Sequence, residues 1–206
     1  MDRLKEMNGS REGRFLERAE GRGLHISPLA PLPSLCFLLL GAKEMLLAGL
    51  AVALLHELAH IGAIYLTGGR VIGISLEPFG GQIYTDGRLC SYRDSLLISC
   101  AGIAVNLLSS LLLFIKDLPD SFFLFALCSL AMGLFNLFPF KGLDGGDILS
   151  NLLLLRFSQQ ASEKVCFAVS LLALIPLCFF TVYSMAFSIF NPTLLLLTCY
   201  LIFTLI

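Results

Sequence analysis

Two histidines and a glutamate stand inside a long apolar stretch of the chain, in the segment LLHELAHI at positions 54–61. His56 and His60 are four residues apart, so on a helix their imidazoles lie one above the other and can share a metal ion. Glu57 is turned about 100° from His56, which places its carboxylate beside the metal, where it can take a proton from a bound water. This H-E-x-x-H pattern predicts a metal site with two imidazole ligands and a carboxylate base, for which zinc is the typical ion.

The composition indicates a polytopic membrane protein. Of the 206 residues, 57% are hydrophobic and 14% are charged, and the mean hydropathy is +0.85. Soluble domains have roughly 45–50% apolar and about 25% charged residues. A chain of this length folded in water would expose much of its apolar surface, which excludes the soluble classes. No Gly-rich phosphate loop or basic-aromatic surface points to a nucleic-acid partner.

Several apolar segments are long enough to cross a bilayer, which takes about 20 helical residues. The clear ones are residues 45–66, 95–115, 121–140 and 165–190, and two shorter ones are residues 29–42 and 193–206. We therefore expect an all-α polytopic membrane protein with about six transmembrane helices. The H-E-x-x-H motif lies in the first clear segment, where an ionisable residue is costly and usually has a functional partner. A chance pattern with one ordinary buried histidine is the alternative.

The basic residues predict the orientation of the chain. With six crossings and a cytoplasmic N-terminus, all of the 14 Lys and Arg residues except Lys43 and Lys116 fall in cytoplasmic segments, as the positive-inside rule requires. Both termini would then be cytoplasmic. Residues 1–27 would form a flexible cytoplasmic tail, and residues 28–206 a single transmembrane domain. The seven cysteines contain no CxxC pair and are interpreted as packing residues.

A catalytic zinc site needs a third protein ligand, and residues 136–147, NLFPFKGLDGGD, offer a carboxylate. Proline and glycines break the apolar pattern here, and irregular backbone at membrane depth is tolerated only where it is buried in protein or lines a wet cavity. We expect Asp144 to be the third ligand. Asp147 is the rival, although one turn further on it is better placed to cap the helix in solvent. A cysteine ligand, or His25 in the tail, is less favoured.

The two motifs resemble the site-2 protease family of intramembrane zinc metalloproteases, which pairs H-E-x-x-H with a downstream Asn-Pro-x-Pro-x-Leu-Asp-Gly-Gly motif. The resemblance implies that His56, His60 and Asp144 bind one Zn²⁺ ion and that Glu57 is the catalytic base. Asn136 matches the asparagine of the motif. It is expected to hold the substrate backbone or to orient the Asp144 loop, and a purely structural hydrogen bond is the alternative.

The second motif departs from the family pattern at two positions. Leu137 and Gly142 stand where many members have proline, which affects the stiffness of the backbone but not the ligands. Residues 101–106, AGIAVN, resemble an Ala/Gly-Gly-Pro-x-x-Asn element of the family, with Ile103 in place of proline.

Residues 68–84, GGRVIGISLEPFGGQIY, resemble the strand-like loop of the compact family members, which include the sporulation protease that processes a pro-sigma factor. Strand-forming residues flank the turn signal Pro-Phe-Gly-Gly at 78–81, so a short β-hairpin is expected. Its unpaired edge could receive a substrate segment in extended form. A plain surface hairpin is the alternative.

The resemblance implies hydrolysis of a peptide bond in or near a transmembrane segment of a membrane-tethered protein, for example to release a transcription or sigma factor. It also implies a bacterial cell membrane or a forespore-type membrane, and regulatory membrane proteins as further partners. The orientation predicted from the basic residues, independently of the resemblance, places both motifs, and so the active site, toward the cytoplasm. A membrane metal-ion transporter or binding protein is the main alternative, and an inactive relative is another. A transporter usually needs polar positions along a path, whereas the other spans nearly lack charge.

Overall fold

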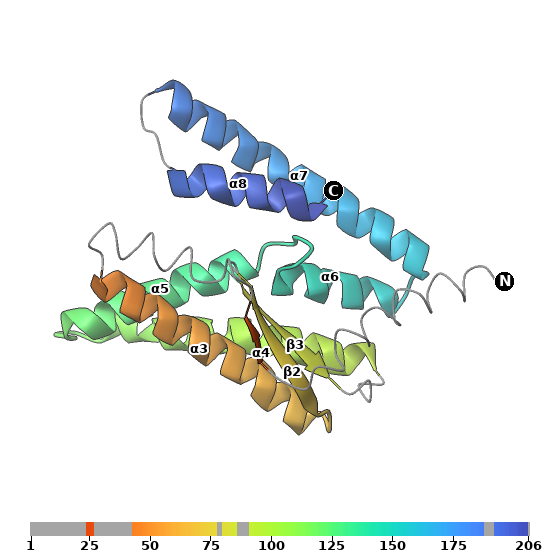
Figure 1. Cartoon of the computed structure of the whole chain (residues 1–206), viewed down its shortest axis with the longest axis horizontal. Helices are drawn as coiled ribbons and strands as arrows, with labels where there is room; N and C mark the ends of the chain where they lie inside the picture. Colours follow the sequence, from red (N-terminus) through yellow and green to blue (C-terminus); the bar gives the residue numbers. More distant parts are fainter. Residues whose placement is uncertain (1–23, 27–42, 78–79, 86–90, 188–191, 206) are drawn as a thin grey trace.

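The computed structural model of the chain describes residues 24–26, 43–77, 80–85, 91–187 and 192–205 (Figure 1). This part of the chain is mostly helical, with six α-helices and one small sheet. The helices are α3 (Lys43–Leu66), α4 (Tyr92–Ser110), α5 (Asp120–Asn136), α6 (Asp144–Leu154), α7 (Gln159–Ala186) and α8 (Pro192–Leu205), and the 3₁₀ turn η1 (Leu111–Phe114) continues α4. The strands are β1 (Leu24–Ile26), β2 (Val71–Glu77) and β3 (Gly80–Thr85).

Among the described helices, three are long and apolar enough to cross a membrane, namely α3, α7, and α4 together with η1. They match three of the four clear segments of the sequence. The fourth, α5, has 17 residues and ends at Asn136 instead of residue 140. Pro139 explains the early end, because proline lacks a backbone N–H and disfavours helix in the residue before it. Of the two shorter segments, residues 193–206 correspond to α8, and residues 29–42 lie outside the described residues.

The outer surfaces of the helices suit a lipid environment. Large apolar side chains such as Leu58 on α3 and Phe179 on α7 are 60% and 71% exposed. A soluble protein rarely exposes such side chains in continuous patches. The expectation of a mostly helical membrane protein is thus confirmed, with three spans among the described residues that satisfy the length and composition of a crossing.

The predicted hairpin is confirmed as the antiparallel pair β2–β3, in which Ile74 lies opposite Ile83. The strand β1 pairs in parallel with the other edge of β2, so the sheet order is β1-β2-β3. The last residues of the segment predicted as a tail therefore take part in this sheet. The turn residues 78–79 lie outside the described part.

Helix α4 is central to the bundle, because it packs against α3, α5 and α6. Figure 1 shows α7 and α8 lying together on the side of α5 and α6 that faces away from α3. The α7–α8 pair packs against the α5–α6 connection, residues 137–143. Its residues Phe140 and Leu143 form a buried cluster with Leu174 of α7 and Leu201 of α8.

The α5–α6 connection is held on both of its sides. From α7, the Ser170 hydroxyl donates a hydrogen bond of 2.8 Å to the Pro139 carbonyl. From α6, Gly145 and Gly146 lie against the backbone of the connection. A Cβ atom on Gly146 would overlap the Phe140 carbonyl, so only glycine permits this contact. The connection and the first turn of α6 are thus one packed unit.

We predict that Gly146→Ala destabilises the protein, because the added methyl group overpacks this unit. Overpacking costs about 1–3 kcal/mol, which corresponds to a decrease in Tm of about 2–12 °C for a chain of this size. The measurement is thermal unfolding of the detergent-solubilised protein. The matched control is Gly49→Ala on α3, where a Cβ meets nothing within 4 Å, and where alanine favours the helix. Equal Tm values for the two variants would contradict the packing described here.

Candidate metal centre

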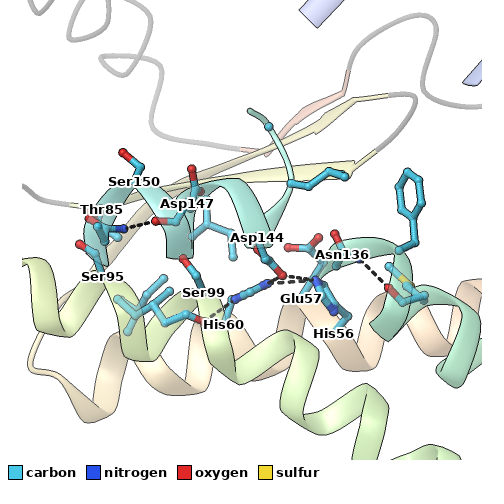
Figure 2. A pocket seen from close by; sticks show the side chains of 18 residues that line it. His56, Glu57, His60, Thr85, Ser95, Ser99, Asn136, Asp144, Asp147 and Ser150 are labelled. Atoms are coloured by element: carbon cyan, nitrogen blue, oxygen red, sulfur yellow. Dashed lines mark hydrogen bonds and ion pairs between the residues drawn. The ribbon is translucent and has the colours of Figure 1, made fainter. Parts of the chain in front are cut away.

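Helix α3 brings the two histidines of the motif to one point. His56 and His60 are 3% and 8% exposed, and their Nε2 atoms are 3.0 Å apart. Figure 2 shows both rings pointing toward Asp144. Glu57, one residue after His56, is half-buried and lines the same pocket as the histidines. The helical spacing thus brings the two imidazoles together and places the Glu57 carboxylate beside them, as the sequence predicted.

Asp144 reaches this point from the other side of the site. It is the first residue of α6, and its Oδ2 atom lies 3.0 Å from His56 Nε2 and 3.3 Å from His60 Nε2. The ligand atoms of the three residues all lie within 4.8 Å of one another. The first turn of a helix also favours a negative charge. The packed unit of the α5–α6 connection therefore fixes the carboxylate in front of the histidines.

The donor chemistry of these three side chains fits a cation. His60 Nδ1 lies 2.8 Å from the Ile98 carbonyl, which can only accept, so Nδ1 carries the proton and Nε2 of the neutral ring offers a lone pair. Asp144 Oδ2 is buried and, within the described part of the chain, has no hydrogen-bond partner besides the two Nε2 atoms that face it. Tetrahedral zinc with ligand distances of 2.0–2.1 Å separates neighbouring ligand atoms by about 3.3 Å. The observed separations of 3.0–3.3 Å match that geometry.

Asp147, the rival ligand, lies one turn further along α6 and is exposed. It lines the pocket, but it is not part of the three-residue ligand group. That group contains no cysteine among the described residues. The side chain of His25 lies outside the described part of the chain. The structure thus places Asp144, and not Asp147, together with the two histidines.

The space for the centre depends on Gly102 of α4. A Cβ atom at this position would lie 2.5 Å from His60 Nε2 and 2.6 Å from His56 Cε1. These separations are too short for any side chain, so glycine allows the α4 backbone to contact both imidazoles. Small residues serve this purpose between membrane helices, where they allow close approach.

The pocket in front of the centre has a volume of about 560 Å³, within the usual range for binding sites. Asn136, at the end of α5, lines it and donates a hydrogen bond of 3.1 Å to the Met132 carbonyl. From the sheet, β3 contributes Ile83 and Thr85 to the lining. Within the described part of the chain, four helices and one strand therefore surround the site.

Several polar residues of the pocket are not among the site residues predicted from the sequence. Figure 2 shows Ser95, Ser99, Ser150 and Thr85 toward one end of it. A signal for the α4 residues was present in the sequence. Small or polar residues recur along one face of this helix at intervals of three or four residues, namely Ser95, Ser99, Gly102, Asn106 and Ser110. Such a stripe in an apolar helix indicates a packed or functional face.

Comparison with known proteins agrees with this geometry. Residues 115–177 match the model of the family described as Peptidase family M50, and this segment includes Asn136 and Asp144. No curated protein matches the chain by sequence. Among solved structures, the chain is similar to a site-2 protease from Methanocaldococcus jannaschii, with a TM-score of 0.67, 23% identity and 90% coverage of each chain. At this identity the likeness shows the fold.

The chain has the fold of a site-2 protease, and its residues 115–177 are similar to the M50 peptidases. The predicted activity, that of an intramembrane metalloprotease, is confirmed at this level. The His-His-Asp cluster supplies the candidate metal site that such an enzyme requires, and the apolar helices supply the membrane domain.

We predict that Gly102→Ala abolishes high-affinity metal binding, because the methyl group occupies the space of the imidazole edges. Bound metal would be measured by elemental analysis of the purified metalloprotease. Gly62→Ala on α3 is the control, since a Cβ there meets nothing within 4 Å, and it should retain the metal. A Gly102→Ala variant with the metal content of the wild type would contradict the close contact between α3 and α4.

Proposed function

We propose that this metalloprotease hydrolyses a peptide bond in or near a transmembrane segment of a membrane-tethered protein. The observation that carries the proposal is the convergence of His56, His60 and Asp144 beside Glu57 in one pocket. A metal-binding or transport protein needs the ligands alone. The neighbouring carboxylate adds what hydrolysis requires, a group that can accept and return a proton.

The residues of the pocket have different roles in peptide hydrolysis. When Zn²⁺ is bound by His56, His60 and Asp144, it supplies Lewis acidity that activates a water and polarises the peptide carbonyl. Glu57 accepts the proton of the attacking water and passes it to the nitrogen of the leaving amine. Asn136, at the other end of the pocket lining, offers its amide to the substrate backbone.

We infer that the substrate enters in an extended conformation along β3. This strand is an edge of the sheet among the described residues, and its Ile83 and Thr85 line the pocket. An extended segment that pairs with a sheet edge exposes its peptide bonds one by one, whereas a substrate helix keeps them hydrogen-bonded within itself. Pairing with β3 would therefore supply the local unwinding that cleavage needs.

We propose that the site faces the cytoplasm of a bacterial or forespore-type membrane, as the distribution of basic residues predicts. In that orientation the C-terminal half of α3, with both histidines, and the start of α6 lie on the cytoplasmic side. A compact enzyme of this kind suits the release of a membrane-tethered transcription or sigma factor, as in the sporulation-type members of the site-2 protease family. Regulatory membrane proteins would then control access to the pocket.

We predict that Glu57→Gln abolishes proteolysis and leaves metal bound, because the amide cannot accept the proton while the ligands are unchanged. A loss of at least about 10²-fold is typical for removal of a general base. The assay is co-expression with candidate membrane-tethered transcription factors, followed by detection of the released fragment and by metal analysis. Cleavage by the variant would refute the assigned role. Metal transport that survives in the variant, without cleavage by the wild type, would favour the transporter.

We predict that Asn136→Ala lowers the cleavage rate while metal content and Tm stay close to those of the wild type. The reason is that Asn136 lines the pocket and its own hydrogen bond is a local one, to Met132 on the same helix. Cleavage of the co-expressed substrate, metal content and Tm are measured together. A parallel fall in metal content would assign Asn136 to the Asp144 loop instead of the substrate.

A further inference from the structure

The second ring nitrogen of His56 faces an amide nitrogen, and this pairing conflicts with metal binding through Nε2. His56 Nδ1 lies 3.0 Å from Asn106 Nδ2 of α4. If His56 binds metal through Nε2, the neutral ring carries its proton on Nδ1, so that two donors face each other. The Asn106 Oδ1 atom, by contrast, is buried without any hydrogen-bond partner. The two side chains are 3% and 0% exposed, so water cannot readily resolve the conflict.

A half-turn of the Asn106 amide, which exchanges its oxygen and nitrogen, resolves both the donor–donor pairing and the unpaired oxygen. The oxygen and nitrogen of an asparagine amide have nearly the same shape, and the network of hydrogen bonds decides their assignment. With Oδ1 toward the ring, the amide oxygen accepts from His56 Nδ1–H and is no longer unpaired. The amide N–H groups then need an acceptor. Ser129 of α5 has a fully buried hydroxyl without a partner, and lies one turn before Gly133, whose position borders Asn106.

We propose that Asn106 is a positioning residue that holds His56 in the metal-binding tautomer through its amide oxygen. The inference concerns the same metal centre as the proposed function. It gives His56 the same kind of support that His60 receives from the Ile98 carbonyl, 2.8 Å from its Nδ1. Metal-ligating histidines commonly donate their other N–H to an oxygen, which fixes the ring and raises its basicity. One helix, α4, would thus orient both imidazoles.

The test compares two variants of Asn106 that differ in hydrogen bonding. Asn106→Leu keeps the approximate size and removes the acceptor. Asn106→Asp keeps an oxygen acceptor and removes the amide donor. We expect Asn106→Leu to weaken zinc binding about 10–100-fold, the usual effect of removing such a partner, and Asn106→Asp to stay within a few-fold of the wild type. Affinity is measured with the purified protein against a competing chelator, and the ligand field from the absorption spectrum of the Co²⁺-loaded protein.

A control and a direct measurement separate orientation from folding. Ser110→Ala alters another buried polar residue on the same face of α4, whose hydroxyl bonds only to the Leu107 carbonyl, and it should leave zinc affinity unchanged. With ¹⁵N-histidine labelling, NMR of the zinc-loaded wild type should show His56 protonated at Nδ1.

Three results would overturn the proposal. One is an Nε2-protonated His56 in the zinc-loaded wild type. Another is a zinc affinity of Asn106→Leu equal to that of the wild type. The third is an Asn106→Asp variant no better than Asn106→Leu, because the amide donor would then be the important group. None of these results bears on proteolysis itself, which the Glu57→Gln comparison tests separately.

Discussion

The approach of α4 to α3 at Gly102 is the contact on which the rest of the centre depends. Without a side chain at this position, the backbone of α4 lies directly against the edges of both imidazoles. One turn before it, the Ile98 carbonyl reaches His60, and one turn after it, Asn106 reaches His56. A larger residue would separate the helices and remove both hydrogen bonds together. Orientation of the ligands is therefore a consequence of helix packing.

The position of Asp144, the third candidate ligand, depends on a second close contact, formed by irregular backbone. Helix α5 ends early because of Pro139, and an irregular connection leads from it to α6, which begins at Asp144. Such backbone is costly in lipid unless protein surrounds it. Here Phe140 is 2% exposed, and Ser170 of α7 binds the carbonyl of Pro139. The pair α7–α8 thus stabilises a loop that the metal site needs but that lipid could not tolerate.

The sequence predicted the parts of this protein that depend on local patterns. Helical spacing made His56 and His60 neighbours, long apolar runs predicted the spans α3, α4 and α7, and strand formers around a turn signal predicted the β2–β3 hairpin. Asp144 was found because glycines and a proline broke an apolar run. The parts that depend on contacts between distant segments were not predicted. Three features could not be predicted because each depends on a segment distant in the sequence. They are the short helix α6, the parallel pairing of β1 with β2, and the contact between Asn106 and His56.

The polar stripe of α4 suits a candidate metal site that must admit water at membrane depth. Its residues Gly102 and Asn106 lie at the histidines, whereas Ser95 and Ser99 line the end of the pocket that also contains Ser150 and Thr85 (Figure 2). Hydroxyl groups there can hydrogen-bond to water, which an apolar wall would exclude. In the proposed orientation this end lies toward the cytoplasm, near the start of α4. The same helix face would therefore lead water in from the cytoplasm and hold the imidazoles that bind the metal, which is why it is polar in an otherwise apolar span.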